Sequence, residues 1–69
     1  MNRWIDAEKF QPPAMRDVLV TIIGDGIGRV VDLAYLGHDH CWRYTGGPEG
    51  IHLQVSHWQH LPPPAEARP

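Results

Sequence analysis

Two β-branched apolar runs separated by a short glycine turn constrain the fold of this chain more than any other feature. The first run, Val-Leu-Val-Thr-Ile-Ile, covers residues 18–23, and β-branched side chains favour strands. Gly24-Asp25-Gly26 follows it, and glycine accepts the positive φ that tight hairpin turns require. The second run covers residues 29–36. The pattern predicts an antiparallel hairpin.

Two further strands are predicted downstream of this hairpin. A turn at residues 37–40 leads to a short strand at 41–44, and a glycine- and proline-containing loop covers 45–50. Residues 51–58 then alternate between apolar and polar side chains, which is typical of a half-buried strand. We therefore predict a four-stranded antiparallel meander, in a mainly β or small α+β fold.

Strict alternation assigns faces within the last predicted strand. It places Ile51, Leu53, Val55 and His57 on one face and Trp58 on the other. We expect His57 to lie at the sheet edge, hydrogen-bonded and packed by Trp58.

The two ends of the chain are expected to be less regular. Asp6 could cap one helical turn over residues 6–9, and Pro12-Pro13 prevents a longer helix. Together with Trp4, Ile5 and Phe10, this segment is expected to form a lid over one sheet face. Pro62-Pro63-Pro64 predicts a proline-rich tail in polyproline II. We assign residues 1–64 to one domain and 65–69 to a flexible tail.

Composition limits the classes of protein to which this chain can belong. A domain of 69 residues buries only roughly 60% of its unfolded surface, so Trp4, Trp42 and Trp58 are expected to supply much of the core. Cys41 is the only cysteine, which excludes a disulfide-stapled miniprotein. No apolar run of signal-peptide or membrane-spanning length is present, so we expect a soluble protein of the cytoplasm, without a membrane partner.

The charges disfavour direct binding of nucleic acid. The net charge is −2, and the six basic residues are scattered singly along the chain. Four carboxylates fall in or beside the predicted turns and strands: Asp25, Asp32, Asp39 and Glu49. The simplest interpretation is an ordinary solvated surface. The sharper one is an acidic face that imitates the phosphates of DNA and binds a basic partner.

No set of residues in the sequence predicts an active site, a cofactor or a metal. His38, His40 and Cys41 lie close together, but they lack the paired spacing typical of zinc sites. Adjacent strand residues point to opposite faces, so His40 cannot readily activate the Cys41 thiol. Gly24 to Gly28 opens a strand rather than a helix, so the segment is not a phosphate-binding loop. We predict a protein that is not an enzyme.

The order of several motifs resembles the small phage and prophage proteins of the family called domain of unknown function 551. The resemblance covers most of residues 4–64. Its most specific part is the ending, where His-Trp, two intervening residues and Leu-Pro recur in that family. The chain departs from the family pattern at Asp6-Ala7 and at Phe10 to Pro13. The motifs that carry the resemblance are Trp4-Ile5, Val18-Leu19-Val20, Tyr35, Trp42 and His57-Trp58-Gln59-His60-Leu61-Pro62.

The resemblance implies a small β domain of phage or mobile-element origin, with no assigned chemistry. By analogy, we expect a phage-encoded inhibitor that acts in the cytoplasm of a bacterial host, as anti-CRISPR proteins do. Its expected partner is a host protein complex with a basic nucleic-acid-binding surface, such as a CRISPR-type surveillance complex. We expect the protein to be a monomer or a weak homodimer. The alternative function is a self-associating accessory or structural module, and the second alternative is a metal- or thiol-dependent enzyme.

Overall fold

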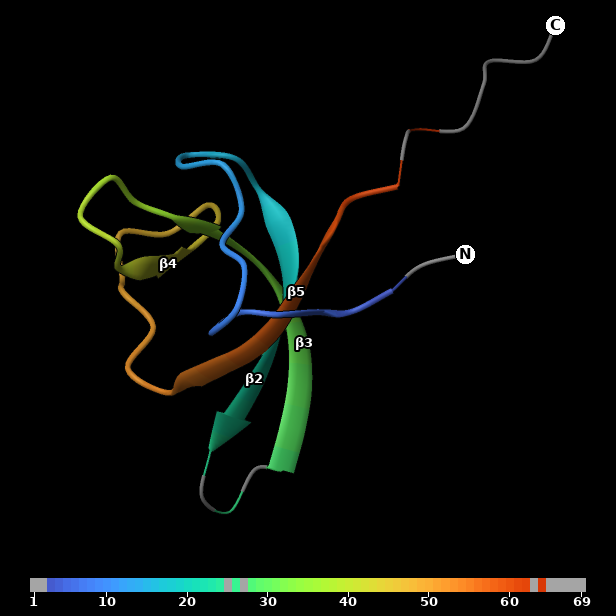
Figure 1. Cartoon of the computed structure of the whole chain (residues 1–69). Helices are drawn as coiled ribbons and strands as arrows, with labels where there is room; N and C mark the ends of the chain where they lie inside the picture. The colour runs from blue at the N-terminus through green and yellow to red at the C-terminus, as the bar shows by residue number, and fades with distance from the viewer. Residues whose placement is uncertain (1–2, 25, 27, 63, 65–69) are drawn as a thin grey trace, which may run out of the picture.

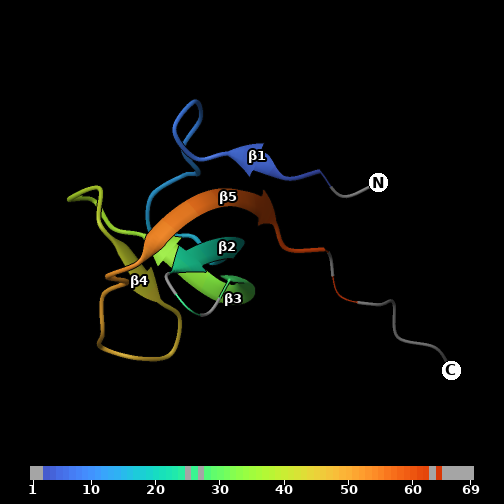
Figure 2. The same cartoon turned by 90° about the horizontal axis from the view of Figure 1, so that it is seen from below.

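A single antiparallel sheet of five strands dominates the part of the chain that the structure describes, residues 3–24, 26, 28–62 and 64. The structure is a computed structural model. Figure 1 draws the whole chain. The strand order across the sheet is β1-β5-β2-β3-β4, and β1, β5, β2 and β3 follow one another in this order in Figure 2. The strands are β1 (Ile5–Asp6), β2 (Val18–Gly24), β3 (Gly28–Leu36), β4 (Trp42–Tyr44) and β5 (Gln54–His60).

The predicted mainly β fold and the hairpin between β2 and β3 are confirmed, but the predicted meander is wrong in its last step. β5 does not pair with β4; it crosses to the other side of the hairpin and pairs with β2. β2 therefore has a neighbour on each side. Val18, Val20 and Ile22 are consequently among the most buried side chains, whereas a meander would have left this apolar run at a sheet edge.

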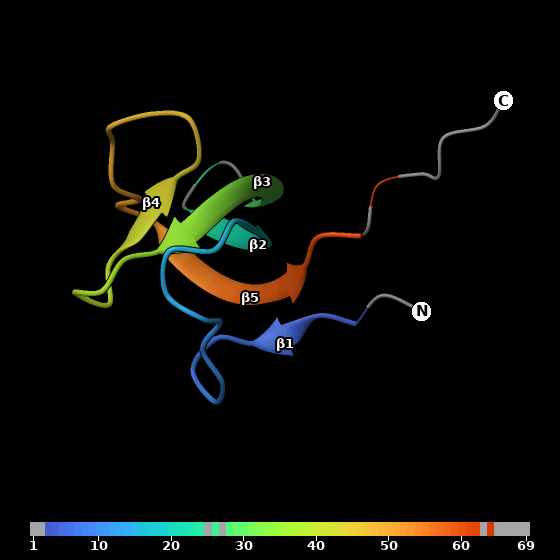
Figure 3. The ribbon, with the colours of Figure 1, turned by 90° about the horizontal axis from the view of Figure 1, so that it is seen from above.

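The segment that was expected to form a lid contributes the fifth strand. Ile5 lies opposite Trp58 and Asp6 opposite His57, so β1 flanks β5 at one edge of the sheet, with β4 at the other (Figure 3). A hydrogen-bonded turn follows, in which the Phe10 N–H donates to the Asp6 carbonyl oxygen over 3.0 Å. Ile5 and Ala7 pack against the core. The Phe10 side chain does not, because it is 67% exposed.

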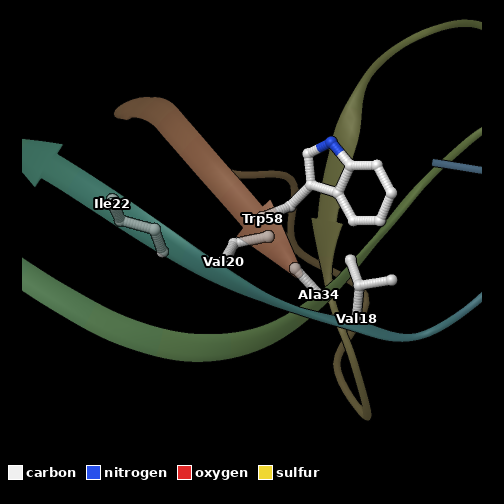
Figure 4. Close-up of a cluster of buried hydrophobic side chains, with 5 residues drawn as sticks. All are labelled: Val18, Val20, Ile22, Ala34 and Trp58. Atoms are coloured by element: carbon white, nitrogen blue, oxygen red, sulfur yellow. The ribbon is translucent and has the colours of Figure 1, made fainter. Parts of the chain in front are cut away.

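The hydrophobic core lies on one face of the sheet. It is centred on Val18, Val20, Ile22, Ala34 and Trp58 (Figure 4). The three tryptophans contribute unequally, contrary to expectation. Trp58 is 4% exposed and Trp42 packs against the core from β4, whereas Trp4 is 41% exposed.

An irregularity in β5 corrects the predicted faces of the last strand. Thr21 lies opposite His57, but the next residue, Ile22, lies opposite Val55, so Ser56 is an extra residue on β5. Such a bulge interrupts strict alternation. Val55 and Trp58 therefore share the core face, and His57 lies on the other.

The prediction that His57 lies at the sheet edge against Trp58 is therefore wrong in two respects. β5 is an interior strand, between β1 and β2. The aromatic neighbour of Trp58 is His60, whose ring centroid lies 5.0 Å away in an edge-on arrangement. The expected hydrogen bond does exist: the His57 Nδ1 atom lies 2.9 Å from the Ser56 hydroxyl.

The first part of β3 extends beyond its neighbour. β4 pairs only with Ala34, Tyr35 and Leu36, and every residue from 28 to 33 is exposed. In Figure 1 this part of the hairpin projects away from β4.

Two further predictions concern the chain ends and the membrane. Within the described residues, no helix is long and apolar enough to cross a membrane. The tail predicted at 65–69 lies outside the residues that the structure describes.

Candidate functional site

The predicted acidic residues that the structure describes lie in three different elements of the fold. Asp32 is exposed in the middle of β3, and its Oδ1 accepts the Leu33 N–H over 2.7 Å. Asp39 lies in the turn beyond the end of β3, and Glu49 is exposed in the loop that follows β4. The part of β3 between Asp32 and Leu36 alone spans roughly 13 Å, at about 3.3 Å per residue. Asp25 lies outside the described residues.

The charge of Asp39 is compensated within its own turn. Both carboxylate oxygens of Asp39 accept hydrogen bonds from the Arg43 guanidinium, over 3.0 and 2.7 Å. These bonds, together with one from the Cys41 N–H, hold the pKa of Asp39 far below its usual range. The pKa of Arg43 is raised by the same contact. Asp39 therefore offers a partner less net negative charge than an unpaired carboxylate would.

The turn between β3 and β4 also holds the histidine and cysteine residues that the sequence singles out. His38, His40 and Cys41 are all exposed there. The Cys41 N–H donates to Asp39 Oδ1 over 3.1 Å, and His40 has a positive φ of 65°. Across the described ranges, no three His, Cys, Asp or Glu side chains are grouped so that they could hold a metal ion.

A pocket lies on the face of the sheet opposite the core. Its volume is about 380 Å³ and it is open to solvent. Four separate segments contribute its lining: Trp4 precedes β1, Thr21 lies in β2, Arg29 and Val31 lie in β3, and His57 lies in β5.

The strand register explains why these residues meet. Thr21 in the central strand lies opposite His57 on one side and opposite Val31 on the other. Directly opposed residues of antiparallel strands project from the same face, and Arg29 joins them because it lies two residues before Val31. The bulge at Ser56 is essential, since it allows His57 to face the pocket while Trp58 and Val55 both face the core.

Arg29 is the one formally charged side chain among the residues that line the pocket. The described residues form one ion pair, between Arg43 of β4 and Asp39 in the turn before β4, so Arg29 has no ion-pair partner among them. The His57 ring can offer its Nε2 atom, since Nδ1 contacts the Ser56 hydroxyl. Asp6 lies opposite His57 across the β1–β5 ladder, and its Oδ1 accepts the Glu8 N–H over 2.9 Å. The pocket thus combines a guanidinium and an imidazole with apolar walls.

This composition suits a ligand group that is both anionic and partly apolar. Guanidinium binds carboxylates bidentately, while the exposed indole of Trp4 and the side chain of Val31 offer apolar contact area. The local sequence pattern does not reveal this site, because it shows Arg29 only as one of several scattered cations and predicts Trp4 to be part of a lid. The pocket residues of β3 and β5 meet because Thr21 pairs with both neighbouring strands. This pairing requires β5 to lie beside β2.

Comparison with protein-family models, curated proteins and solved structures gives no match to this chain. The resemblance to the phage family stays a prediction carried by the motifs in the sequence.

Proposed function

We propose that this chain is a small, non-catalytic binding protein that recognises another protein through the pocket face of its sheet. One observation carries the proposal: Arg29, a cation without a carboxylate partner in the described chain, lines an open pocket beside the exposed indole of Trp4. Exposed aromatic and arginine side chains are enriched at the energetically dominant positions of protein interfaces.

The pocket face has stronger support than an acidic, DNA-like face. Asp39 is neutralised by Arg43, and Asp32 uses one carboxylate oxygen to accept a local hydrogen bond. A mimic of DNA needs several uncompensated carboxylates along one surface. Asp32 and Glu49 remain available for such a role.

The resemblance to small phage proteins supplies the biological setting of the proposal. In that setting the chain is a phage-encoded inhibitor in the bacterial cytoplasm, and its partner is a host protein complex such as a CRISPR-type surveillance complex. An acidic segment of that complex is the feature that the pocket would bind.

Two charge reversals on the same strand test which face binds. Arg29 and Asp32 lie three residues apart in β3 and project from opposite faces, and both are exposed. Two assays would compare the wild-type protein with Arg29→Glu and Asp32→Lys. The first measures capture of partners from a host lysate, and the second measures the relief of host defence when the protein is expressed. Loss of both effects with Arg29→Glu alone supports the pocket face. Loss with Asp32→Lys alone supports the acidic face, and no loss with either contradicts binding through β3.

The alternative function, self-association, is favoured by a different observation. In the described part of the chain, β3 has no neighbour on its outer side beside residues 28–32, since the first contact there is the one from Thr45 to Leu33, and unpaired edges can pair with a second copy. Light scattering over a range of protein concentrations tests this alternative. A molecular mass that stays at that of the monomer would remove it.

A further inference from the structure

Successive residues of β3 direct their backbone N–H and C=O groups to opposite sides of the strand. Three hydrogen bonds show which residues face β2 and which face β4. The Thr45 N–H donates to the Leu33 carbonyl oxygen over 3.1 Å, and the Gly37 N–H donates to the Cys41 carbonyl oxygen over 2.9 Å. Both contacts lie on the β4 side. On the β2 side, the Leu36 carbonyl oxygen accepts the Met15 N–H over 2.8 Å. Odd-numbered residues of β3 therefore direct their backbone groups toward β4, and even-numbered residues direct theirs toward β2.

This alternation leaves a short free edge. Arg29 and Val31 direct their N–H and C=O groups away from β2, and β4 pairs with β3 only from Ala34 onward. Leu33 closes the edge, because its N–H donates to Asp32 Oδ1 and its carbonyl oxygen accepts from Thr45. Within the residues that the structure describes, the free edge thus consists of four backbone groups on Arg29 and Val31. Val31 itself is 58% exposed.

The free edge borders the pocket. The side chains of Arg29 and Val31 line the pocket, and their backbone groups form the edge. A strand that pairs with this edge would place the side chains of its residues opposite Arg29 and Val31 on the pocket face. One added strand can therefore form backbone hydrogen bonds and fill the pocket at the same time.

We infer that the free edge of β3 binds an extended segment of the partner protein by strand addition, with a carboxylate side chain of that segment against Arg29. This inference rests on the proposed function and names the chemistry of its partner. The main-chain hydrogen bonds would supply affinity and the pocket would select the side chain. The guanidinium of Arg29, which has no ion-pair partner among the described residues, selects a glutamate or aspartate at that position.

Charge complementarity favours an acidic segment over a second copy of the chain. In an antiparallel pairing of two β3 edges that uses all the free groups, Arg29 of one copy would lie opposite Val31 of the other. The nearest carboxylate on the strand, Asp32, projects from the opposite face. As far as the described residues go, such a dimer would leave both guanidinium groups without a carboxylate.

Two matched peptides test the inference on the wild-type protein. Both are terminally blocked and alternate threonine with valine; one carries a central glutamate and the other a glutamine. We expect the glutamate peptide to bind about tenfold more tightly. We also expect it to slow hydrogen exchange of the Arg29 and Val31 amides, which face solvent in the free protein. Failure of both peptides to bind at millimolar concentration, equal affinities, or binding without slowed exchange at these amides would overturn the inference.

Substitutions at the edge separate the backbone contribution from that of the side chain. Val31→Pro removes an outward N–H and leaves the ladder to β2 intact, whereas Val31→Thr keeps the N–H and the β-branched shape. We expect Val31→Pro to abolish peptide binding and Val31→Thr to retain it. Arg29→Gln should abolish the preference for glutamate. Slow exchange of the Val30 and Asp32 amides, which face β2, verifies that Val31→Pro is folded.

The same variants distinguish failure of this inference from failure of the proposed function. If Val31→Pro is folded and still captures the host partner while Arg29→Glu does not, strand addition is wrong and binding through the pocket stands. If neither variant affects capture, both are wrong. If the Arg29 and Val31 amides become protected as the protein is concentrated without peptide, a second copy occupies the edge and the inference is overturned.

Discussion

Trp58 Nε1 donates a hydrogen bond of 2.8 Å to the carbonyl oxygen of Phe10, across most of the length of the chain. The indole is also a core residue, opposite Val20 on one side and Ile5 on the other. One side chain thus packs against the central strand and holds the segment after β1 in place. In a domain with so small a core, such a dual role has a large energetic weight.

Replacing Trp58 tests this role. Trp58→Phe keeps an aromatic ring but removes the donor, and we expect the free energy of unfolding to fall by about 1–3 kcal/mol, from the lost hydrogen bond and imperfect packing. Urea unfolding followed by circular dichroism measures the change. Phe10→Ala is the matched control, because the bond uses the backbone of Phe10 and its side chain is exposed. A larger loss for Phe10→Ala than for Trp58→Phe would contradict the assignment.

Trp4 is expected to behave differently from the two other tryptophans. Because its side chain is 41% exposed and lies outside the core cluster, Trp4→Ala should lower the free energy of unfolding by less than about 1 kcal/mol. Trp42→Ala should cost more, since Trp42 packs against the core. Denaturant unfolding of both variants measures which of the two losses is larger. Acrylamide quenching of Trp4 fluorescence, in a variant that carries Trp42→Phe and Trp58→Phe, measures the exposure of Trp4. A larger loss for Trp4→Ala than for Trp42→Ala would show that Trp4 is a core residue.

The local part of the fold could be predicted from the sequence, because local signals specify it. The β-branched run and its glycine turn located β2 and β3 to within a residue, and the short strand at β4 was found as well. The position of β5 could not be predicted in this way. Alternation shows that residues form a strand, but it does not show which strand lies beside it.

The bulge and the pocket were missed for the same physical reason. Ser56 interrupts the alternation of β5, and nothing in the local pattern distinguishes it from an ordinary outward-facing serine. The pocket joins residues from positions 4 to 57, so its prediction requires both the strand order and the bulge. Carboxylates close together in the sequence, such as Asp32 and Asp39, suggested a binding face instead. In the structure, Asp32 lies within β3 and Asp39 lies in the turn beyond its end.

Deletion of Ser56 tests whether this one extra residue accounts for the bulge in β5, which lets Val55 and Trp58 face the core together. Thr21 and Ile22 lie opposite His57 and Val55, so removing Ser56 would make the pairing continuous and keep Trp58 and Val55 on the core face. We expect the variant to fold, with a loss of about 1–3 kcal/mol. The loss arises because the Ser56 carbonyl oxygen accepts the Ala7 N–H and its hydroxyl contacts His57.

A deletion on the neighbouring strand provides the control for this prediction. Removing Thr21 would also shorten one strand by a single residue, but it would place Val20 and Ile22 on opposite faces. We expect that variant to be unfolded. Circular dichroism and the emission maximum of the buried Trp58 report both outcomes. An unfolded Ser56 deletion beside a folded Thr21 deletion would refute this account of the register.

The Asp39–Arg43 pair predicts how the stability of the protein depends on acid. The pKa of Asp39 is lowered in the folded protein by its bonds to Arg43, so the folded state binds this proton less readily than the unfolded state. The contribution of the pair is present above the unfolded pKa of about 4. It is lost as the pH falls from there through the much lower folded value. A titration of the side-chain carboxyl carbons by nuclear magnetic resonance should show Asp39 still ionised well below pH 4.

Gly37 offers a way to disturb this pair without changing either charge. A Cβ atom at Gly37 would overlap the Arg43 guanidinium and crowd the Asp39 carboxylate. We therefore expect Gly37→Ala to displace Arg43 and to raise the pKa of Asp39 toward its usual range, as Arg43→Gln should do by removing the charge. The acid-induced loss of stability in both variants should be correspondingly smaller between pH 4 and strongly acidic conditions. An Asp39 pKa that is near 4 in the wild type and unchanged in both variants would show that the pair does not persist in solution.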